Sequence, residues 1–167
     1  MGVSVEVLEG LRGQIGATQR HELGEVTSMM IRRYARAIGE TDPVHLDPDA
    51  ARAQGYPDVI ATPNMLVGIV GWGDGGAESE LRADGTEVGE HLPGIPASGV
   101  RVMGGGEEMH FHRDVVAGTT VTQEIELIDV TDKQTKEGAM AVVRYQVAFS
   151  DGDGQPLLSS SRTVLVR

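Results

Sequence analysis

The chain contains no cysteine, which excludes disulfide bonds, thiolate metal sites and cysteine nucleophiles. Basic residues are few: 14 Lys and Arg face 25 Asp and Glu, so the formal net charge is −11. A general nucleic-acid surface needs a basic face, so we expect no nucleic-acid partner. No apolar run reaches the length of about 18 residues that a membrane span needs. The first residues also lack the basic and apolar parts of a signal peptide, so we expect a cytoplasmic protein.

What the sequence does contain fits one domain. A length of 167 residues is enough to bury a core unaided, and we assign residues 1–167 to a single domain. Glycine is abundant, at 23 residues, and many of the glycines fall between residues 71 and 106. We therefore expect a glycine-rich loop at about residues 71–106, with one strand at most.

Three helices are expected in the first half of the chain. The first runs over about residues 27–38, with Thr27 or Ser28 as N-cap and Gly39 as the stop. The second is capped by Asp47, starts at Pro48 and ends at Gly55. The third follows Thr62 as N-cap and is almost wholly apolar over residues 64–70, which is typical of a buried helix.

The last third of the chain is strand-like. Strands are expected over residues 107–116, 121–130, 139–149 and 157–166, with turns at residues 117–119 and 151–154. In the third of these strands every second residue from 139 to 149 is apolar, which predicts one buried face. Helices followed by antiparallel strands indicate an α+β fold, with the sheet packed on the apolar helix.

The stretch of residues 39–47 is where chemistry is expected. It holds three carboxylates (Glu40, Asp42 and Asp47) and one histidine, His45. Proline at position 43 pushes the preceding residue into extended geometry, so this segment forms a loop between two helices. A histidine and a carboxylate on such a loop can converge for general acid–base catalysis. The alternative is that His45 is a structural histidine and that Asp42 and Asp47 are turn and helix caps.

Several short motifs follow one another along the chain. After the first helix come Ala-Ile-Gly-Glu, Asp-Pro, a histidine and an aspartate, then Ala-Ala-Arg-Ala with Gly-Tyr, and then Ala, Pro and Met at alternate positions. Later come Phe-His-Arg-Asp and Ala-Gly-Thr. These motifs occupy residues 37–47, 50–56, 61–65, 111–114 and 117–119.

This order resembles the MaoC-like, or (R)-specific enoyl hydratase, family, and most closely its dehydratase N-terminal-type branch. The resemblance covers most of residues 25–167, and segment 71–106 carries little of it. It implies the hotdog fold, in which an antiparallel sheet wraps around a central apolar helix. It also implies a homodimer, or a heterodimer with another hotdog subunit.

The resemblance further implies reversible hydration of a trans-2-enoyl thioester to an (R)-3-hydroxyacyl thioester. The thioester is carried by coenzyme A or an acyl carrier protein, so no separate cofactor and no metal are needed. The catalytic candidates are Glu40, His45 and Asp42, and the substrate-binding candidates are Asn64 and Thr62. Glu40, Asp42 and Asn64 stand where the family motifs have Asp, Asn and Gly.

Two other functions remain open at the level of sequence. One is a non-catalytic partner subunit of a heterodimeric dehydratase, and the other is a hotdog acyl-CoA thioesterase. Arg101 and Arg113 are suggested as phosphate contacts. His110 and His112 have a spacing that could suit a metal, but with no third ligand nearby we favour a polar face or a dimer contact.

Overall fold

A five-stranded antiparallel sheet dominates the computed structural model, which describes residues 2–68, 78–81, 92–96 and 98–167. The spatial order of the strands is β1-β3-β4-β5-β2, so β1 and β2 form the two edges. The strands are β1 (Thr18–Val26), β2 (Val102–Phe111), β3 (Thr119–Thr135), β4 (Gly138–Asp151) and β5 (Pro156–Val166).

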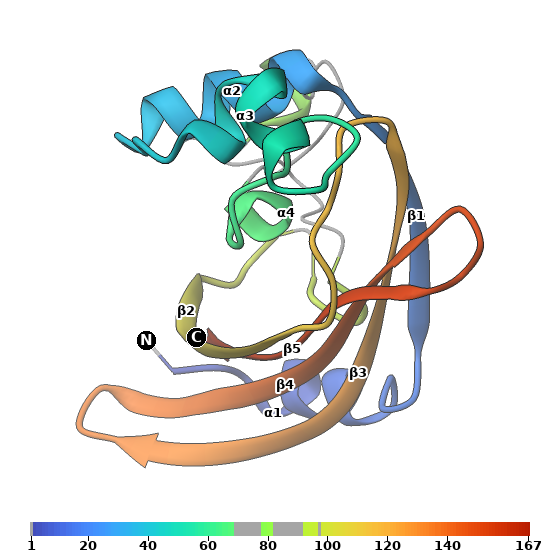
Figure 1. Ribbon diagram of the computed structural model, residues 1–167. Helices are drawn as coiled ribbons and strands as arrows, with labels where there is room; N and C mark the ends of the chain where they lie inside the picture. Colours follow the sequence, from blue (N-terminus) through green and yellow to red (C-terminus); the bar gives the residue numbers. More distant parts are fainter. Residues whose placement is uncertain (1, 69–77, 82–91, 97) are drawn as a thin grey trace.

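The helices are short and lie at both ends of the sheet and inside its curve. Figure 1 shows α2 and α3 at one end, α1 at the other, and α4 on the concave side of the sheet. The helical segments are α1 (Val5–Arg12), α2 (Ser28–Ala37), η1 (Pro43–His45), α3 (Pro48–Ala53), α4 (Met65–Gly68) and η2 (Glu78–Glu80). The α+β class predicted from the sequence is confirmed.

The central strand β4 shows why the sheet folds this way. From Ala141 to Phe149 every second side chain is buried, as the alternation in the sequence predicts. Tyr145 and Val147 are fully buried and lie opposite Leu127 and Ile125 of the neighbouring strand β3. These residues belong to the main core cluster, which also takes in Met65 and Leu66 of α4. The sheet therefore packs its concave face on the apolar helix.

The glycine-rich loop ends earlier than predicted, because β2 begins at Val102 rather than at residue 107. The ladder between β2 and β5 is irregular between Gly104 and Gly106, and a Cβ on Gly105 would lie 2.8 Å from Cγ2 of Thr163. The glycines thus let β2 approach β5 closely. Of residues 71–101, the structure describes 78–81, 92–96 and 98–101.

The third helix also differs from the prediction. It is observed over Met65–Gly68, and residues 69 and 70 lie outside the described part of the chain. The backbone carbonyl of Thr62 accepts the N–H of Met65 at 3.0 Å, so a tight turn precedes the helix. Within the described residues the Thr62 hydroxyl has no hydrogen-bond partner, so it does not act as the predicted N-cap. No helix in the described part of the chain is long and apolar enough to span a membrane.

Candidate active site

The end of α2 sets the direction of the loop that carries the candidate catalytic residues. Thr27 caps the start of α2 as predicted, accepting the N–H of Met30 at 3.2 Å. Gly39 follows the helix with a φ of 77°, a conformation that glycine adopts at little cost. The N–H of Glu40 then returns to the carbonyl of Ala35 at 2.9 Å, so Glu40 leaves the helix at a defined angle.

Glu40 folds back onto its own loop. Its Oε1 accepts the backbone N–H of Thr41 at 2.8 Å and that of Asp42 at 2.9 Å. These two hydrogen bonds, that of Asp42 being the stronger cause, hold the pKa of Glu40 below its ordinary value, and the nearby His45 lowers it further. Glu40 is therefore ionised at neutral pH, with its second oxygen left to accept a hydrogen bond.

Asp42 has a structural partner. Its Oδ1 accepts the N–H of Val44 at 3.0 Å, which makes it the N-cap of η1 before Pro43. In the same way Asp47 caps α3 by accepting the N–H of Asp49 at 2.9 Å. The capping role considered for both aspartates is thus what the geometry shows, and a catalytic role for Asp42 stays a prediction.

His45 is held by a single backbone carbonyl. It is only 9% exposed, and its Nδ1 lies 2.7 Å from the carbonyl oxygen of Ile60. A carbonyl can only accept, so Nδ1 carries the hydrogen and the neutral ring keeps its lone pair on Nε2. In its protonated form His45 lowers the pKa of Glu40, and among the described residues no ion pair joins the two side chains.

Thr62 and Asn64 lie on the segment that leads into α4. Thr62 is buried, at 4% exposure, and its hydroxyl is without a partner among the described residues. Asn64 is exposed, and its carbonyl accepts the N–H of Gly68 at 2.9 Å. Within the described part of the chain no hydrogen bond uses the N–H of Asn64. Both residues can therefore offer a donor to a ligand.

The remaining polar candidates lie elsewhere. Arg113 lies between β2 and β3 and donates at 2.7 Å to Asp151 at the end of β4, so its charge is already paired. Arg101 exchanges two backbone hydrogen bonds with Arg167. His112 lies just beyond the end of β2, not within a strand as predicted, and its Nε2 is 2.9 Å from the hydroxyl of Ser159. In the described residues no three His, Asp or Glu side chains gather into a metal-binding group.

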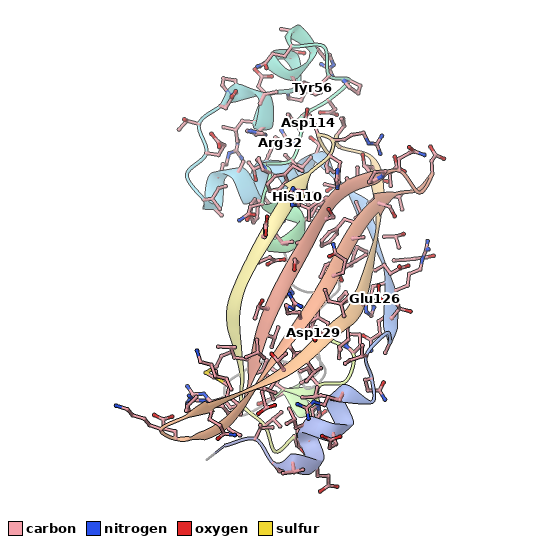
Figure 2. The ribbon with its side chains drawn as sticks, turned by 90° about the horizontal axis from the view of Figure 1, so that it is seen from below. Arg32, Tyr56, His110, Asp114, Glu126 and Asp129 are labelled. Atoms are coloured by element: carbon pink, nitrogen blue, oxygen red, sulfur yellow. The ribbon has the colours of Figure 1, made fainter. Side chains whose placement is uncertain are left out.

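Sequence reasoning missed the acceptor of His45. A backbone carbonyl leaves no trace in a side-chain motif, so Ile60 could not be found in that way. It also missed the hydrogen bond from the Tyr56 hydroxyl to the Asp114 carboxylate, at 2.7 Å. Here a signal was present, because Asp114 stands in the Phe-His-Arg-Asp motif where the resembled family has proline. Figure 2 shows Tyr56 and Asp114 at the same end of the sheet.

Comparison with known proteins identifies the family. Residues 13–159 match the model of the FAS1-like dehydratase domain region, and the chain belongs to this family of MaoC-like hotdog proteins. A UPF0336 protein of Clavibacter michiganensis is 34% identical over 82% of this chain and 81% of its own length. A Mycobacterium tuberculosis protein, the 3-oxo-4,17-pregnadiene-20-carboxyl-CoA hydratase alpha subunit, is 30% identical over 77% of this chain and 40% of its own length.

Solved structures confirm the hotdog fold. The ChsH1-ChsH2 complex of Mycobacterium tuberculosis matches with a TM-score of 0.69 at 23% identity, covering 96% of this chain and 90% of the matched chain. The R-hydratase PhaJ1 of Pseudomonas aeruginosa matches with a TM-score of 0.65 at 17% identity, covering 90% and 79%. The fold implied by the sequence resemblance is thereby shown.

Proposed function

We propose that the protein is an acyl-thioester hydratase or dehydratase that interconverts trans-2-enoyl and (R)-3-hydroxyacyl thioesters. The observation that carries the proposal is the fixed imidazole of His45, whose Nδ1 lies 2.7 Å from the Ile60 carbonyl, on the same loop as the ionised carboxylate of Glu40. An acceptor nitrogen and an acceptor oxygen on one loop can hold one water molecule between them. Such a pair suits addition of water to an activated double bond.

In this proposal the two side chains have different roles. Glu40 is ionised and accepts a hydrogen bond from the water, which orients its oxygen toward the β-carbon of the enoyl thioester. His45 takes the proton of that water on Nε2 as the oxygen attacks. The resulting imidazolium then supplies a proton to the α-carbon on the same face. Dehydration follows the same steps in reverse, so one histidine serves both directions.

The thioester carbonyl gains negative charge as the β-carbon is attacked. The N–H of Asn64, which no other described residue uses, is the proposed donor to that oxygen. Pro63 has no N–H, so Asn64 is the first residue after Thr62 whose backbone can donate a hydrogen bond. The buried Thr62 hydroxyl is a second proposed contact to the substrate, because an unpaired buried hydroxyl is costly unless a ligand satisfies it.

A second hotdog chain is part of the proposal. Strands β1 and β2 are both open edges within the described sheet, and an open edge can pair with another chain. Phe111 at the end of β2 is 52% exposed, a large apolar side chain that a partner could cover. A solved complex of two chains, ChsH1-ChsH2, is among the structures that share this fold. The thioester carrier is either coenzyme A or an acyl carrier protein.

One observation favours a second candidate function, that of a non-catalytic partner subunit. The Oε1 atom of Glu40 is occupied by the backbone N–H groups of Thr41 and Asp42, and among the described residues Glu40 makes no ion pair with His45. It is also one methylene longer than the aspartate of the family motif, and a shift of roughly 1 Å in a catalytic group can cost about a hundredfold in rate. In that case an active subunit would supply the chemistry.

Hydration of crotonyl-CoA by the purified protein tests the proposal. We expect Glu40→Gln to lose activity by roughly 10²-fold or more, because the neutral amide no longer accepts as a carboxylate does. Glu40→Asp restores the family residue and should retain activity. Asp47→Asn, which keeps an oxygen that can cap α3, serves as the matched control. Equal activity in wild type, Glu40→Gln and Asp47→Asn would contradict the assignment.

The partner-subunit alternative makes a different prediction in the same assay. Wild-type protein would then be inactive alone, would associate with a second hotdog subunit, and would support activity that Glu40→Gln leaves unchanged. Measuring mass in solution together with turnover, with and without that subunit, separates the two functions. Activity of the protein alone would exclude the alternative.

A further inference from the structure

A hydrogen bond joins the segment after α3 to the segment between β2 and β3. The hydroxyl of Tyr56, just after α3, donates to Oδ2 of Asp114 at 2.7 Å, and Asp114 lies between β2 and β3. This carboxylate raises the pKa of Tyr56, so the phenol keeps its proton at neutral pH. In the described part of the chain Asp114 has no cationic partner, and the phenol is the group that it binds.

The segments that follow these two residues pair with each other. The N–H of Ala61 donates to the carbonyl of Val115 at 2.7 Å, and that of Ala117 donates to Val59 at 3.0 Å. Ile60 and Val116 form the bridge between these bonds. Backbone groups alternate in direction along an extended chain, so the N–H and carbonyl of Ile60 point away from Val116.

On its other side Ile60 contacts η1. Its N–H donates to the carbonyl of Val44 at 3.3 Å, and its carbonyl accepts Nδ1–H of His45 at 2.7 Å. Ile60 thus lies between the segment of residues 115–117 and the candidate catalytic histidine. Among the described residues the buried cluster around Ile60 is small, with Val44 and Ala51 as its other buried members, and Tyr56 and Val116 pack against it. On either side of Ile60, Val59 and Ala61 belong to the main core cluster.

We propose that Tyr56 and Asp114 are positioning residues that hold the Ile60 carbonyl against His45 and so keep the imidazole in the tautomer with its lone pair on Nε2. The inference rests on the hydratase function proposed above, in which Nε2 accepts the proton of water. Neither residue touches the substrate. Their bond reinforces the backbone pairing of residues 59–61 with residues 115–117, so its loss loosens the acceptor of Nδ1–H.

The test uses the full chain, four single variants and the double variant of Tyr56→Phe with Asp114→Ala. Tyr56→Phe keeps the ring that packs on the local cluster and removes only the donor. Asp114→Ala removes the acceptor, and Asp114→Asn keeps an oxygen in its place. Asp129→Asn is the matched control, since Asp129 is a half-buried carboxylate that pairs with one side chain, Arg144 at 2.9 Å, and Figure 2 shows it well away from Tyr56 along the sheet.

We expect kcat for crotonyl-CoA to fall about tenfold in Tyr56→Phe and Asp114→Ala, the change that corresponds to one lost hydrogen bond. KM should change less than about twofold, because the substrate contacts remain. The double variant should lose no more than either single one, because the two residues act as a pair. Asp114→Asn should recover most of the loss, and Asp129→Asn should match wild type.

A second readout does not depend on turnover. The ¹⁵N shifts of the His45 ring report which nitrogen carries the hydrogen. We expect protonated Nδ1 in wild type and Asp129→Asn, and a mixture of tautomers in Tyr56→Phe. If the wild-type protein hydrates nothing, this shift still supports the positioning role while the proposed function fails. An unchanged ring in Tyr56→Phe, or an equal kcat loss in Asp129→Asn, overturns the inference.

Discussion

The sheet and the loop region of residues 39–61 are built on different principles. The main core cluster joins β1, β3, β4 and β5 to α1, α2 and α4, and its largest members are fully buried. The loop region joins this core only at its end, through Val59 and Ala61, and the described part of it has a small second cluster around Val44, Ala51 and Ile60. Between residues 39 and 58 helix caps and single hydrogen bonds shape the chain. The largest buried side chains thus lie in the sheet, whereas the candidate catalytic residues lie on the part shaped by polar contacts.

The substitution His45→Ala should show the largest difference between an effect on activity and an effect on stability. Loss of a general acid–base group typically costs about 10²- to 10⁴-fold in rate, so crotonyl-CoA hydration should fall by that amount. The free energy of unfolding should fall by only about 1–3 kcal/mol, because one hydrogen bond to the Ile60 carbonyl is lost. Turnover and urea unfolding measure the two effects. If the His45→Ala variant hydrated crotonyl-CoA at the wild-type rate, His45 would not be catalytic.

Phe149→Ala should have the opposite effect. Phe149 on β4 is 1% exposed and faces Leu158 of β5 and Gln123 of β3. Truncating a buried aromatic ring typically destabilises a protein by about 3–5 kcal/mol. Denaturant unfolding should show this loss, while activity per folded molecule stays near that of wild type. A large loss of activity at full stability would show that the two regions are not separate.

A smaller effect is expected from Tyr145→Phe. The Tyr145 hydroxyl donates to the carbonyl of Pro93 at 2.9 Å, and burial raises the pKa of this phenol. Removing the hydroxyl loses one buried hydrogen bond, worth about 1 kcal/mol. The urea midpoint should move down slightly, with no change in KM for crotonyl-CoA. A loss of unfolding free energy as large as that of Phe149→Ala would mean that the core packing depends on this hydrogen bond.

The smallest effect concerns pH. The Arg113 side chain, with help from backbone N–H groups, holds the pKa of Asp151 below its ordinary value. A lowered pKa adds stability that is complete above the ordinary carboxyl pKa and is lost as the pH falls through the lowered one. Asp151→Asn should therefore lower the urea midpoint at pH 7, and by progressively less as the pH falls below the ordinary carboxyl pKa and through the lowered one. If the difference in urea midpoint between wild type and Asp151→Asn grew as the pH fell, the lowered pKa of Asp151 would be contradicted.

Local patterns predicted most of the architecture, and long-range contacts escaped prediction. The alternation along β4 and the caps at Thr27, Asp47 and Gly39 depend on neighbours in sequence, and these predictions are confirmed. The early start of β2 was missed, because strand propensity does not show how closely glycines let β5 approach. The Ile60 carbonyl was missed because backbone groups belong to no motif. The catalytic roles of Glu40 and His45 stay predictions.

The most direct test is a chain-length screen of trans-2-enoyl-CoA hydration, with wild-type protein and His45→Ala measured side by side. The account predicts that wild type hydrates at least one chain length, that the product is the (R)-3-hydroxyacyl thioester, and that His45→Ala shows none of this activity. Absence of hydration at every chain length, or equal rates in the two proteins, would contradict it.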